Sequence, residues 1–237
     1  MPEKNGACLI CGEPIKYLAD AEKMTCSICG KEFESNACCA KNHFVCDDCH
    51  TSPAISVTKY ICSNTKSKNP IEIAKEIMKS PSVHTHGPEY HIIVGASLLA
   101  AYKNAGGKVD IDSALTAVIQ RGKMVPGGFC GLAGACGAGI SSGIFLSAAL
   151  KTNPLSEKNW ALGNLLTSEC LKNISEYGGP RCCKRDSFTS IKTAVKFVEK
   201  HFGIKMELPD ELICEFSKQN HECLKEKCPY YQIEAVQ

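Results

Sequence analysis

From residue 70 onward, the pattern of apolar and polar positions is that of helices. Residues three and four apart share a helical face, and the apolar residues between 191 and 198 follow this spacing (Ile191, Ala194, Val195 and Val198). We find no alternating, period-two strand pattern beyond residue 62. The sequence therefore predicts an all-α helical domain over residues 70–237.

Caps and helix breakers divide this domain into separate helices. We expect them over residues 70–79, 88–105, 112–122, 156–177 and from Pro180 or Asp186 to 202, with a short last one from Pro209. The stretch from Gly127 to Leu150 has 24 residues without a charge, which is enough to cross a bilayer. Seven of them are glycine, so we expect a buried central helix, or a helix and a loop, and no membrane span.

Composition and charge narrow the class of protein. The chain has 237 residues, 44% of them hydrophobic and 22% charged, which is typical of a soluble globular protein. The net charge of +2 indicates neither nucleic acid nor a membrane surface as a partner. No basic and then apolar leader opens the sequence, so we expect a cytoplasmic protein, in which 17 cysteines indicate metal binding, catalysis or redox chemistry.

Eight of the cysteines lie in residues 1–50, which we interpret as a zinc-binding module. Two Cys-x2-Cys pairs each supply half of a tetrahedral site, and Gly12 and Gly30 suit the tight turn after each pair. Two structural zinc ions are expected. The simplest, zinc-ribbon-like assignment gives one ion Cys8, Cys11, Cys26 and Cys29, and the other Cys39 (or Cys38), His43, Cys46 and Cys49. A cross-braced alternative joins the first pair to Cys39 and His43, and the second pair to Cys46 and Cys49; spacing does not decide between them.

The module is followed by a Ser/Thr/Lys-rich stretch, residues 51–69, which we interpret as a connector with a short strand at Ile55–Ile61. Lysines and glutamates are mixed in the module, so no basic face favours nucleic-acid binding. A structural or protein-docking role is the simpler expectation.

The helical domain carries a second set of cysteines. Cys130 and Cys136 lie in a glycine-rich stretch, and Cys182 and Cys183 lie beside Arg181, Lys184 and Arg185. Positive charge favours the thiolate, so we expect lowered thiol pKa values at Cys182 and Cys183 and an attraction for anionic substrates. Tight helix packing is the alternative explanation of the glycines.

Two further groups are candidates for chemistry. His84, His86 and His91 precede or begin a helix beside Glu89, where His86 and His91 can act as acid–base groups and the cluster can bind metal. Near the C-terminus lie Cys214, Cys223 and Cys228, the last followed by Pro229. A Cys-Pro ending is common in runs of iron–sulfur ligands, but the spacings here match no single-cluster pattern. Coordination and terminal stapling both stay open there.

Three segments carry a resemblance: HGPEYH (86–91), VPGGFCGLAGACGAGISSGI (125–144) and RCCKRDS (181–187). They resemble an uncharacterised cysteine-rich domain family of anaerobic microbes, whose members are sometimes attached to SAM-dependent methyltransferases. The part around Cys130 and Cys136 is also similar to redox-active proteins with a C…GCAxxG…C…C pattern, although ACGAGISSG stands in place of GCAxxG. The resemblance covers about residues 30–230 and implies a thiol- or cluster-based role for Cys130, Cys136, Cys182 and Cys183.

The leading hypothesis is a zinc module joined to a helical domain whose Cys130, Cys136 and Cys182 or Cys183 hold an iron–sulfur cluster or form a reactive thiol site. Such a site suits redox or sulfur-transfer chemistry with a redox partner. The alternative is a zinc-dependent adaptor, without enzyme activity, that docks to a methyltransferase or another partner.

Overall fold

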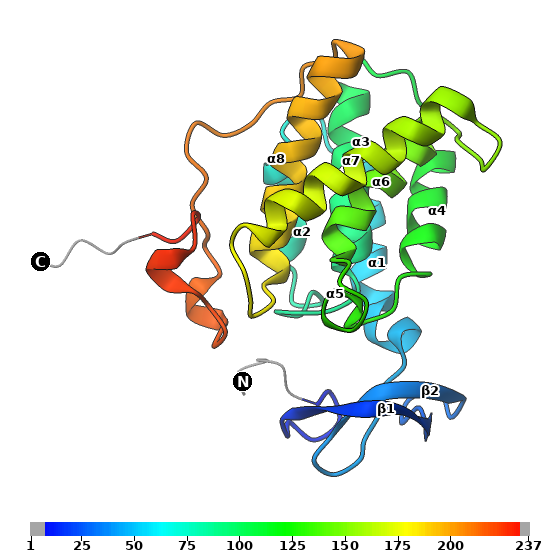
Figure 1. Cartoon of the computed structure of the whole chain (residues 1–237), viewed down its shortest axis with the longest axis vertical. Coiled ribbons are helices and arrows are strands. Elements are labelled where there is room, and N and C mark those ends of the chain that lie inside the picture. Colours follow the sequence, from blue (N-terminus) through cyan, green and yellow to red (C-terminus); the bar gives the residue numbers. More distant parts are fainter. Residues whose placement is uncertain (1–7, 233–237) are drawn as a thin grey trace, which may run out of the picture.

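The computed structural model describes residues 8–232, in which a two-stranded sheet precedes eight helices (Figure 1). Strand and helix bounds are β1 Ile15–Thr25, β2 Glu32–Cys39, α1 Asp47–Asn64, α2 Pro70–Met78, α3 Tyr90–Asn104, α4 Ile111–Gly122, α5 Phe129–Leu132, α6 Gly137–Ala149, α7 Glu157–Ser175 and α8 Cys183–Phe202. Two 3-10 turns follow, Ser217–Gln219 and Lys225–Lys227. The expected small N-terminal module and mostly helical remainder are confirmed.

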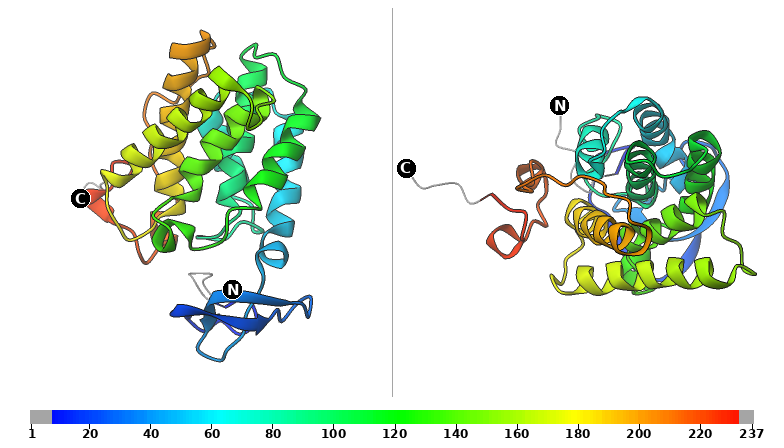
Figure 2. Two further views of the ribbon diagram at one scale, coloured as in Figure 1. Left: turned by 45° about the vertical axis from the view of Figure 1, so that its right-hand side comes forward. Right: turned by 90° about the horizontal axis from the view of Figure 1, so that it is seen from above.

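The N-terminal module, residues 8–50, is built on the antiparallel hairpin of β1 and β2 and includes the start of α1. Ile15 pairs with Cys39 and Thr25 with Glu32, with an irregularity between Tyr17 and Glu22. The hairpin lies at one end of the helical bundle and is joined to it through α1, as the left view of Figure 2 shows. In the module, the buried hydrophobic side chains are all cysteines, so it has no apolar core of its own.

Helix α3 is the centre of the helical domain. Every residue from Tyr90 to Tyr102 is buried, and α3 contacts α1, α2, α4, α6 and α8. A helix covered on all sides carries no polar face, which explains why its residues follow a continuous apolar run rather than an amphipathic pattern. The residues just before α3, His84–Glu89, are thereby held at the end of the bundle that faces the module.

Helix α6 packs closely on α3 through small residues. The Gly95 N–H donates to Ser141 Oγ at 2.9 Å, and a Cβ on Gly95 would lie 2.9 Å from the Ser141 carbonyl oxygen. On the other side of α6, a Cβ on Gly143 would lie 2.0 Å from Thr167 Oγ1 of α7. Close helix packing therefore accounts for Gly95 of α3 and for Gly143 of the Gly127–Leu150 stretch.

Two local expectations are wrong, and a third is decided between the two alternatives given for it. The strand at Ile55–Ile61 is part of α1, whose buried Ala54, Thr58 and Cys62 pack into the core. The stretch 127–150 is broken between α5 and α6, so it is a helix and a loop. The segment after Pro209 forms 3-10 turns only. Across residues 8–232, no helix combines the length and the apolarity needed to cross a membrane.

The C-terminal segment, residues 203–232, runs back along α8 with little regular structure (Figure 1). Tyr230 anchors it, because its hydroxyl lies 3.0 Å from Thr189 Oγ1 and its ring packs edge-on against Phe188. Phe216 is also buried. The segment thus covers the first turns of α8 and the residues that precede them.

Candidate metal centres and the adjoining cleft

The two Cys-x2-Cys pairs form tight turns that prepare their sulfurs for metal binding. Gly12 and Gly30 have φ angles of 77° and 71°, a left-handed conformation that favours glycine. The turn also brings a backbone N–H onto sulfur, as Ile10 N donates to Cys8 Sγ at 3.4 Å. Such N–H···S bonds stabilise the thiolate form that binds metal.

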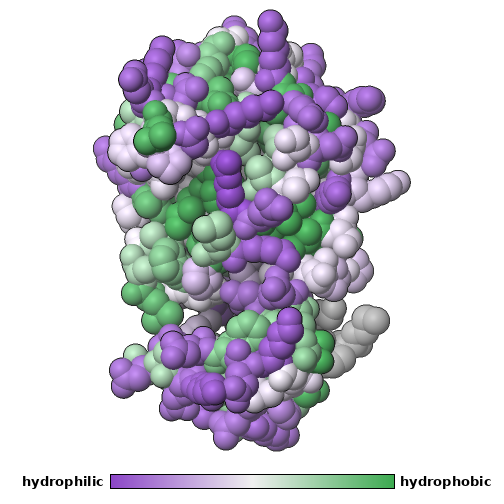
Figure 3. All heavy atoms as spheres, turned by 90° about the vertical axis from the view of Figure 1, so that its right-hand side faces the viewer, coloured by the Kyte–Doolittle hydropathy of each residue, from purple (hydrophilic) through white to green (hydrophobic). Residues whose placement is uncertain are grey.

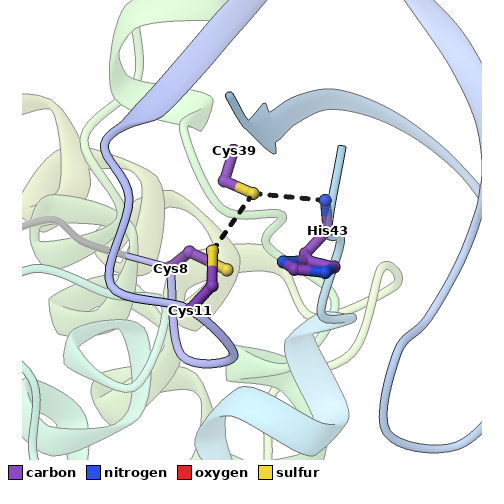
Figure 4. A group of neighbouring side chains, drawn as sticks. All are labelled: Cys8, Cys11, Cys39 and His43. Carbon is purple, nitrogen blue, oxygen red and sulfur yellow. Dashed lines mark hydrogen bonds between the residues drawn. The ribbon is translucent and has the colours of Figure 1, made fainter. Parts of the chain in front are cut away.

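The first metal group combines the first pair with residues at the end of β2. Cys8, Cys11, Cys39 and His43 place one ligand atom each within 4.8 Å of one another. Figure 4 shows the facing sulfurs of Cys11 and Cys39, 3.8 Å apart, and the His43 N–H that donates to Cys39 Sγ at 3.2 Å. His43 Nδ1 is buried without a hydrogen-bond partner among the described residues, as expected for a ligand atom. This group can hold one metal ion.

The second metal group combines the second pair with the start of α1. Cys26, Cys29, Cys46 and Cys49 also lie within 4.8 Å of one another, with Cys29 Sγ and Cys46 Sγ 3.8 Å apart. Burial acts to raise the pKa of Cys26, but backbone N–H groups, that of Cys46 among them, outweigh it and lower the pKa to about 6. A second ion can therefore bind here.

The two groups have the cross-braced arrangement, and the simplest assignment is wrong. Cys8 and Cys11 do not share a group with Cys26 and Cys29, because the hairpin places each pair beside residues from further along the chain. Cys39 belongs to the first group, whereas the neighbouring Cys38 turns away and lies 4.0 Å from Asn42 Oδ1.

A third group of metal-binding side chains lies between the module and the helical domain. It consists of His50, which follows the last module cysteine, and His84 and Glu89, which precede α3. The ring centroids of His50 and His84 lie 4.1 Å apart, and Glu89 Oε1 accepts a hydrogen bond from the His84 backbone N–H at 2.9 Å. Glu89 Oε2 lies 3.6 Å from His50 Nδ1, and both atoms are buried without a hydrogen-bond partner in the described part of the chain.

Glu89 is held as a carboxylate by its surroundings. Burial would raise its pKa, but the imidazoles of His50 and His84 outweigh burial and hold the pKa well below the usual range. Gly87 leaves room for the carboxylate, since a Cβ there would lie 1.9 Å from Glu89 Oε2. The pairing of Glu89 with His50 is not apparent from the sequence, because 38 residues lie between them. The adjacency of Glu89 to the histidine cluster is the one sequence signal that points to Glu89 as a metal ligand.

A cleft of about 1540 Å³ lies between the module and the helical domain. Figure 3 shows this boundary from the side, where the molecule narrows between the helical domain above and the module below. The cleft brings together many of the residues that the sequence singled out. They are His84, His86, His91, Cys130, Arg181 and Cys183.

The thiols of the helical domain divide into two groups. Cys136, at the start of α6, is close enough to Cys130 and Cys183 to interact with each electrostatically. Cys182 lies instead in a second pocket with Cys214, Cys223 and Cys228. The expected lowering of thiol pKa is wrong, because burial raises the pKa of Cys182 and Cys183, and raises that of Cys136 to about 12.

All three cations beside Cys182 have partners, since Arg181 Nε lies 3.6 Å from Glu222 Oε2. Lys184 Nζ is buried and donates to the carbonyl oxygens of His84 and Thr85. Arg185 pairs with Asp186 at 3.0 Å. Arg181 alone of the three lines the cleft, where it stacks over the Tyr17 ring and hydrogen-bonds to the Tyr17 hydroxyl.

The predicted acid–base residues His86 and His91 both line the cleft. Burial lowers the pKa of each, which favours the neutral imidazole near neutral pH. His91 Nδ1 lies 2.9 Å from the Val125 carbonyl oxygen, so it is the donor there and Nε2 is left as the basic nitrogen. His86 Nε2 lies 3.1 Å from Asn220 Oδ1. Their catalytic role stays a prediction.

Comparison with known proteins places the helical domain in a family. No curated protein and no solved structure matches the chain. A model of a family of unknown function, DUF5714, matches residues 58–231, from within α1 to the end of the C-terminal segment. The match covers most of the chain, so the protein belongs to this family of unknown function.

Proposed function

We propose that the protein binds two structural zinc ions in its module and a third metal ion in the cleft, where it performs redox or sulfur-transfer chemistry. One observation carries the proposal: Glu89 converges with His50 and His84, two histidines of the cleft wall, and His50 Nδ1 and Glu89 Oε2 are buried without a hydrogen-bond partner among the described residues. Three-cysteine-plus-histidine and four-cysteine sets are those of closed, structural zinc sites. Two histidines and one carboxylate leave coordination positions open, as catalytic zinc and non-haem iron(II) sites do.

The contents of the cleft favour thiol chemistry beside this metal. The thiols of Cys130 and Cys183 line the same cavity as His84. Arg181, whose side chain is 30% exposed, would bind an anionic substrate in exchange for Glu222, whose Oε2 lies 3.6 Å from its Nε. His91 offers a neutral imidazole nitrogen for proton transfer. A metal ion at the third group would supply the Lewis acid for a sulfur-containing or redox-active anion.

The proposal is tested by metal analysis of protein purified without oxygen, comparing the wild type with Glu89→Gln and His84→Gln. Each variant should lose about one equivalent of a single transition metal and keep the two zinc ions of the module. His201→Gln is the matched control, because His201 stacks on Phe197 in α8, away from the cleft. An unchanged metal content in both Glu89→Gln and His84→Gln would show that the third group binds no metal.

The sulfur-transfer part has its own readout. After incubation with polysulfide, mass spectrometry should find a sulfur atom added to Cys130 or Cys183 in the wild type and much less in Glu89→Gln. Equal uptake of sulfur by the wild type and Glu89→Gln would show that the thiols react independently of the third metal. If neither protein takes up sulfur, redox chemistry is the reaction class to test next.

A zinc-dependent adaptor is the second candidate, and contacts across the cleft favour it. The Gly127 N–H donates to Asp47 Oδ2 at 2.9 Å, and Lys123 pairs with Asp48 at 2.8 Å. Together with His50 and Glu89, these contacts brace the module against the helical domain as a rigid docking body would require. The partner we propose for that case is a methyltransferase. Zinc alone, without a third metal or reactive thiols, is the expected result.

A further inference from the structure

A second pocket lies between the start of α8 and the C-terminal segment, and four cysteines line it. Cys182 precedes α8, while Cys214, Cys223 and Cys228 come from the C-terminal segment. None of these cysteines forms a disulfide. All four lie within residues 58–231, the part that matches the family model. The proposed function assigns no role to them.

The backbone around these cysteines resembles that of the metal-binding turns in the module. The Arg185 N–H donates to Cys182 Sγ at 3.5 Å, and the Lys225 N–H to Cys223 Sγ at 3.4 Å. Cys214 and Cys228 likewise accept hydrogen bonds from the backbone two residues on, at Phe216 and Tyr230. Each sulfur thus receives an N–H two or three positions ahead, the arrangement that stabilises a thiolate ligand.

Buried positive charge surrounds the same pocket. Lys184 and Arg185 line it, and each side chain is almost completely buried. Arg185 Nη1 has no hydrogen-bond partner among the described residues. Asn220 Nδ2 donates to Cys182 Sγ at 3.5 Å. Asp186 offsets the charge of Arg185, so Lys184 is the cation of this pair left to balance the negative charge of four thiolates and their metal cofactor.

The four sulfurs of this pocket lie further apart than those of the two metal groups in the module. Zinc–sulfur bonds of about 2.3 Å place tetrahedral sulfurs ~3.8 Å apart. In the module, the sulfurs of Cys11 and Cys39 lie at that distance, 3.8 Å. No three of the pocket's four sulfurs fall within 4.8 Å of one another in the described structure. This wider spacing suits a larger inorganic core better than a single ion.

The C-terminal segment has little else to hold it in place. It contains only two 3-10 turns across residues 203–232, a length at which irregular chain is uncommon in a compact domain. Its buried hydrophobic side chains, apart from partly buried cysteines, are Met206, Phe216 and Tyr230. A cofactor that links three of its cysteines to α8 would fix the segment, as metals do in other domains with small cores.

We propose that Cys182, Cys214, Cys223 and Cys228 bind a [4Fe–4S] cluster. The cluster site adjoins the cleft, because consecutive residues serve the two: Cys182 faces the cluster pocket and Cys183 lines the cleft. Asn220 also connects them, since its side chain contacts both Cys182 Sγ and His86 Nε2. All four ligand positions are filled by protein, so the cluster stores an electron or holds structure and keeps no iron open to substrate.

The test is iron and acid-labile sulfide content of the full chain purified without oxygen. We expect about four of each per chain, with an electron paramagnetic resonance signal after one-electron reduction by dithionite. Cys182→Ser, Cys214→Ser and Cys228→Ser should each lose most of the iron and this signal. Cys183→Ser is the matched control beside Cys182, and Cys130→Ser and Cys136→Ser test the cleft thiols; all three should keep the cluster.

Three results would overturn the assignment. Iron lost equally in Cys130→Ser and Cys136→Ser would move the cluster to the cleft. One zinc ion lost in Cys223→Ser, with no iron in the wild type, would make the pocket a zinc site. Absence of metal, with two disulfides found by peptide mapping, would show that the cysteines crosslink the C-terminal segment and bind no cofactor. Circular dichroism of each variant checks that the helices persist, and retention of cluster iron in Glu89→Gln separates this site from the third metal.

Discussion

Gly87→Ala perturbs the third metal group without replacing any of its ligands. Gly87 has no positive φ, so alanine suits its backbone. The obstacle is Glu89, because the new Cβ would lie 1.9 Å from Oε2 where ordinary contact begins at 3.4 Å. The carboxylate must therefore retreat by about 1.5 Å. It then loses its position relative to His50 Nδ1 and its bond from the His84 N–H.

The size of the effect follows from the bonds that are displaced. A hydrogen bond to a charged group contributes roughly 1.5–3 kcal/mol, while glycine to alanine in an unobstructed position returns about 0.4–1 kcal/mol. We expect a net loss of roughly 1–2 kcal/mol in the free energy of unfolding, or a Tm lower by about 2–8 °C for a chain of this size. Misplacing a ligand in this way weakens metal binding by roughly 10–100-fold.

Isothermal titration of metal into protein whose third site has been emptied, and thermal melting, measure the two effects. Gly163→Ala in α7 is the control, since a Cβ there meets no atom within 4 Å. It should leave metal binding unchanged and raise stability slightly. Wild-type metal affinity in Gly87→Ala would refute the reasoning, because it would show that the Glu89 carboxylate need not occupy its present position.

Three further predictions concern the module, the thiols and the core. In the cross-braced module, Cys8→Ser/Cys39→Ser should lose about one zinc ion and Cys8→Ser/Cys26→Ser about two; the reverse, about two and about one, would restore the ribbon pairing. Burial raises the pKa of Cys170 to about 12, so this thiol stays protonated near neutral pH and should resist iodoacetamide until the protein unfolds; native alkylation would contradict this. Gly95→Ala should destabilise the fold by about 1–3 kcal/mol in urea melts because its Cβ meets the Ser141 carbonyl; no loss would show that α3 and α6 can separate.

The helices could be predicted wherever their ends carry chemical signals. Asn69 accepts from the backbone of Ile71 and Glu72, as an N-cap before Pro70 should, and Gly203 ends α8 with a φ of 67°. Helix α1 lacked such a signal. Pro53 lies within it and the Ser/Thr composition is typical of a loop, but buried Ala54, Thr58 and Cys62 pack against the core and override the local preference.

The metal residues of the module could be predicted, but not their pairing. Spacing along the chain selects the turns Cys8–Cys11 and Cys26–Cys29, because the two sulfurs of each turn meet locally. Which turn meets Cys39 depends on the register of β1 with β2, where Ile15 pairs with Cys39. The same limit applies to Cys182 and Cys183, since the direction of two adjacent side chains is decided by the start of α8 and by the segment that covers it.

Cysteines are concentrated in the two parts of the chain that have the smallest apolar cores. In residues 8–46 the buried hydrophobic residues are cysteines alone, and in residues 203–232 only Met206, Phe216 and Tyr230 supplement them. Helices α3 and α6, by contrast, are buried by packing and need no metal. Metal removal should therefore unfold the module and release the C-terminal segment while the bundle of α2 to α8 stays helical. The cleft would then lose the wall that the module supplies, and His86 on its other wall would lose its contact with Asn220 of the C-terminal segment. We therefore expect metal binding in these two parts to be required before the proposed chemistry can take place in the cleft.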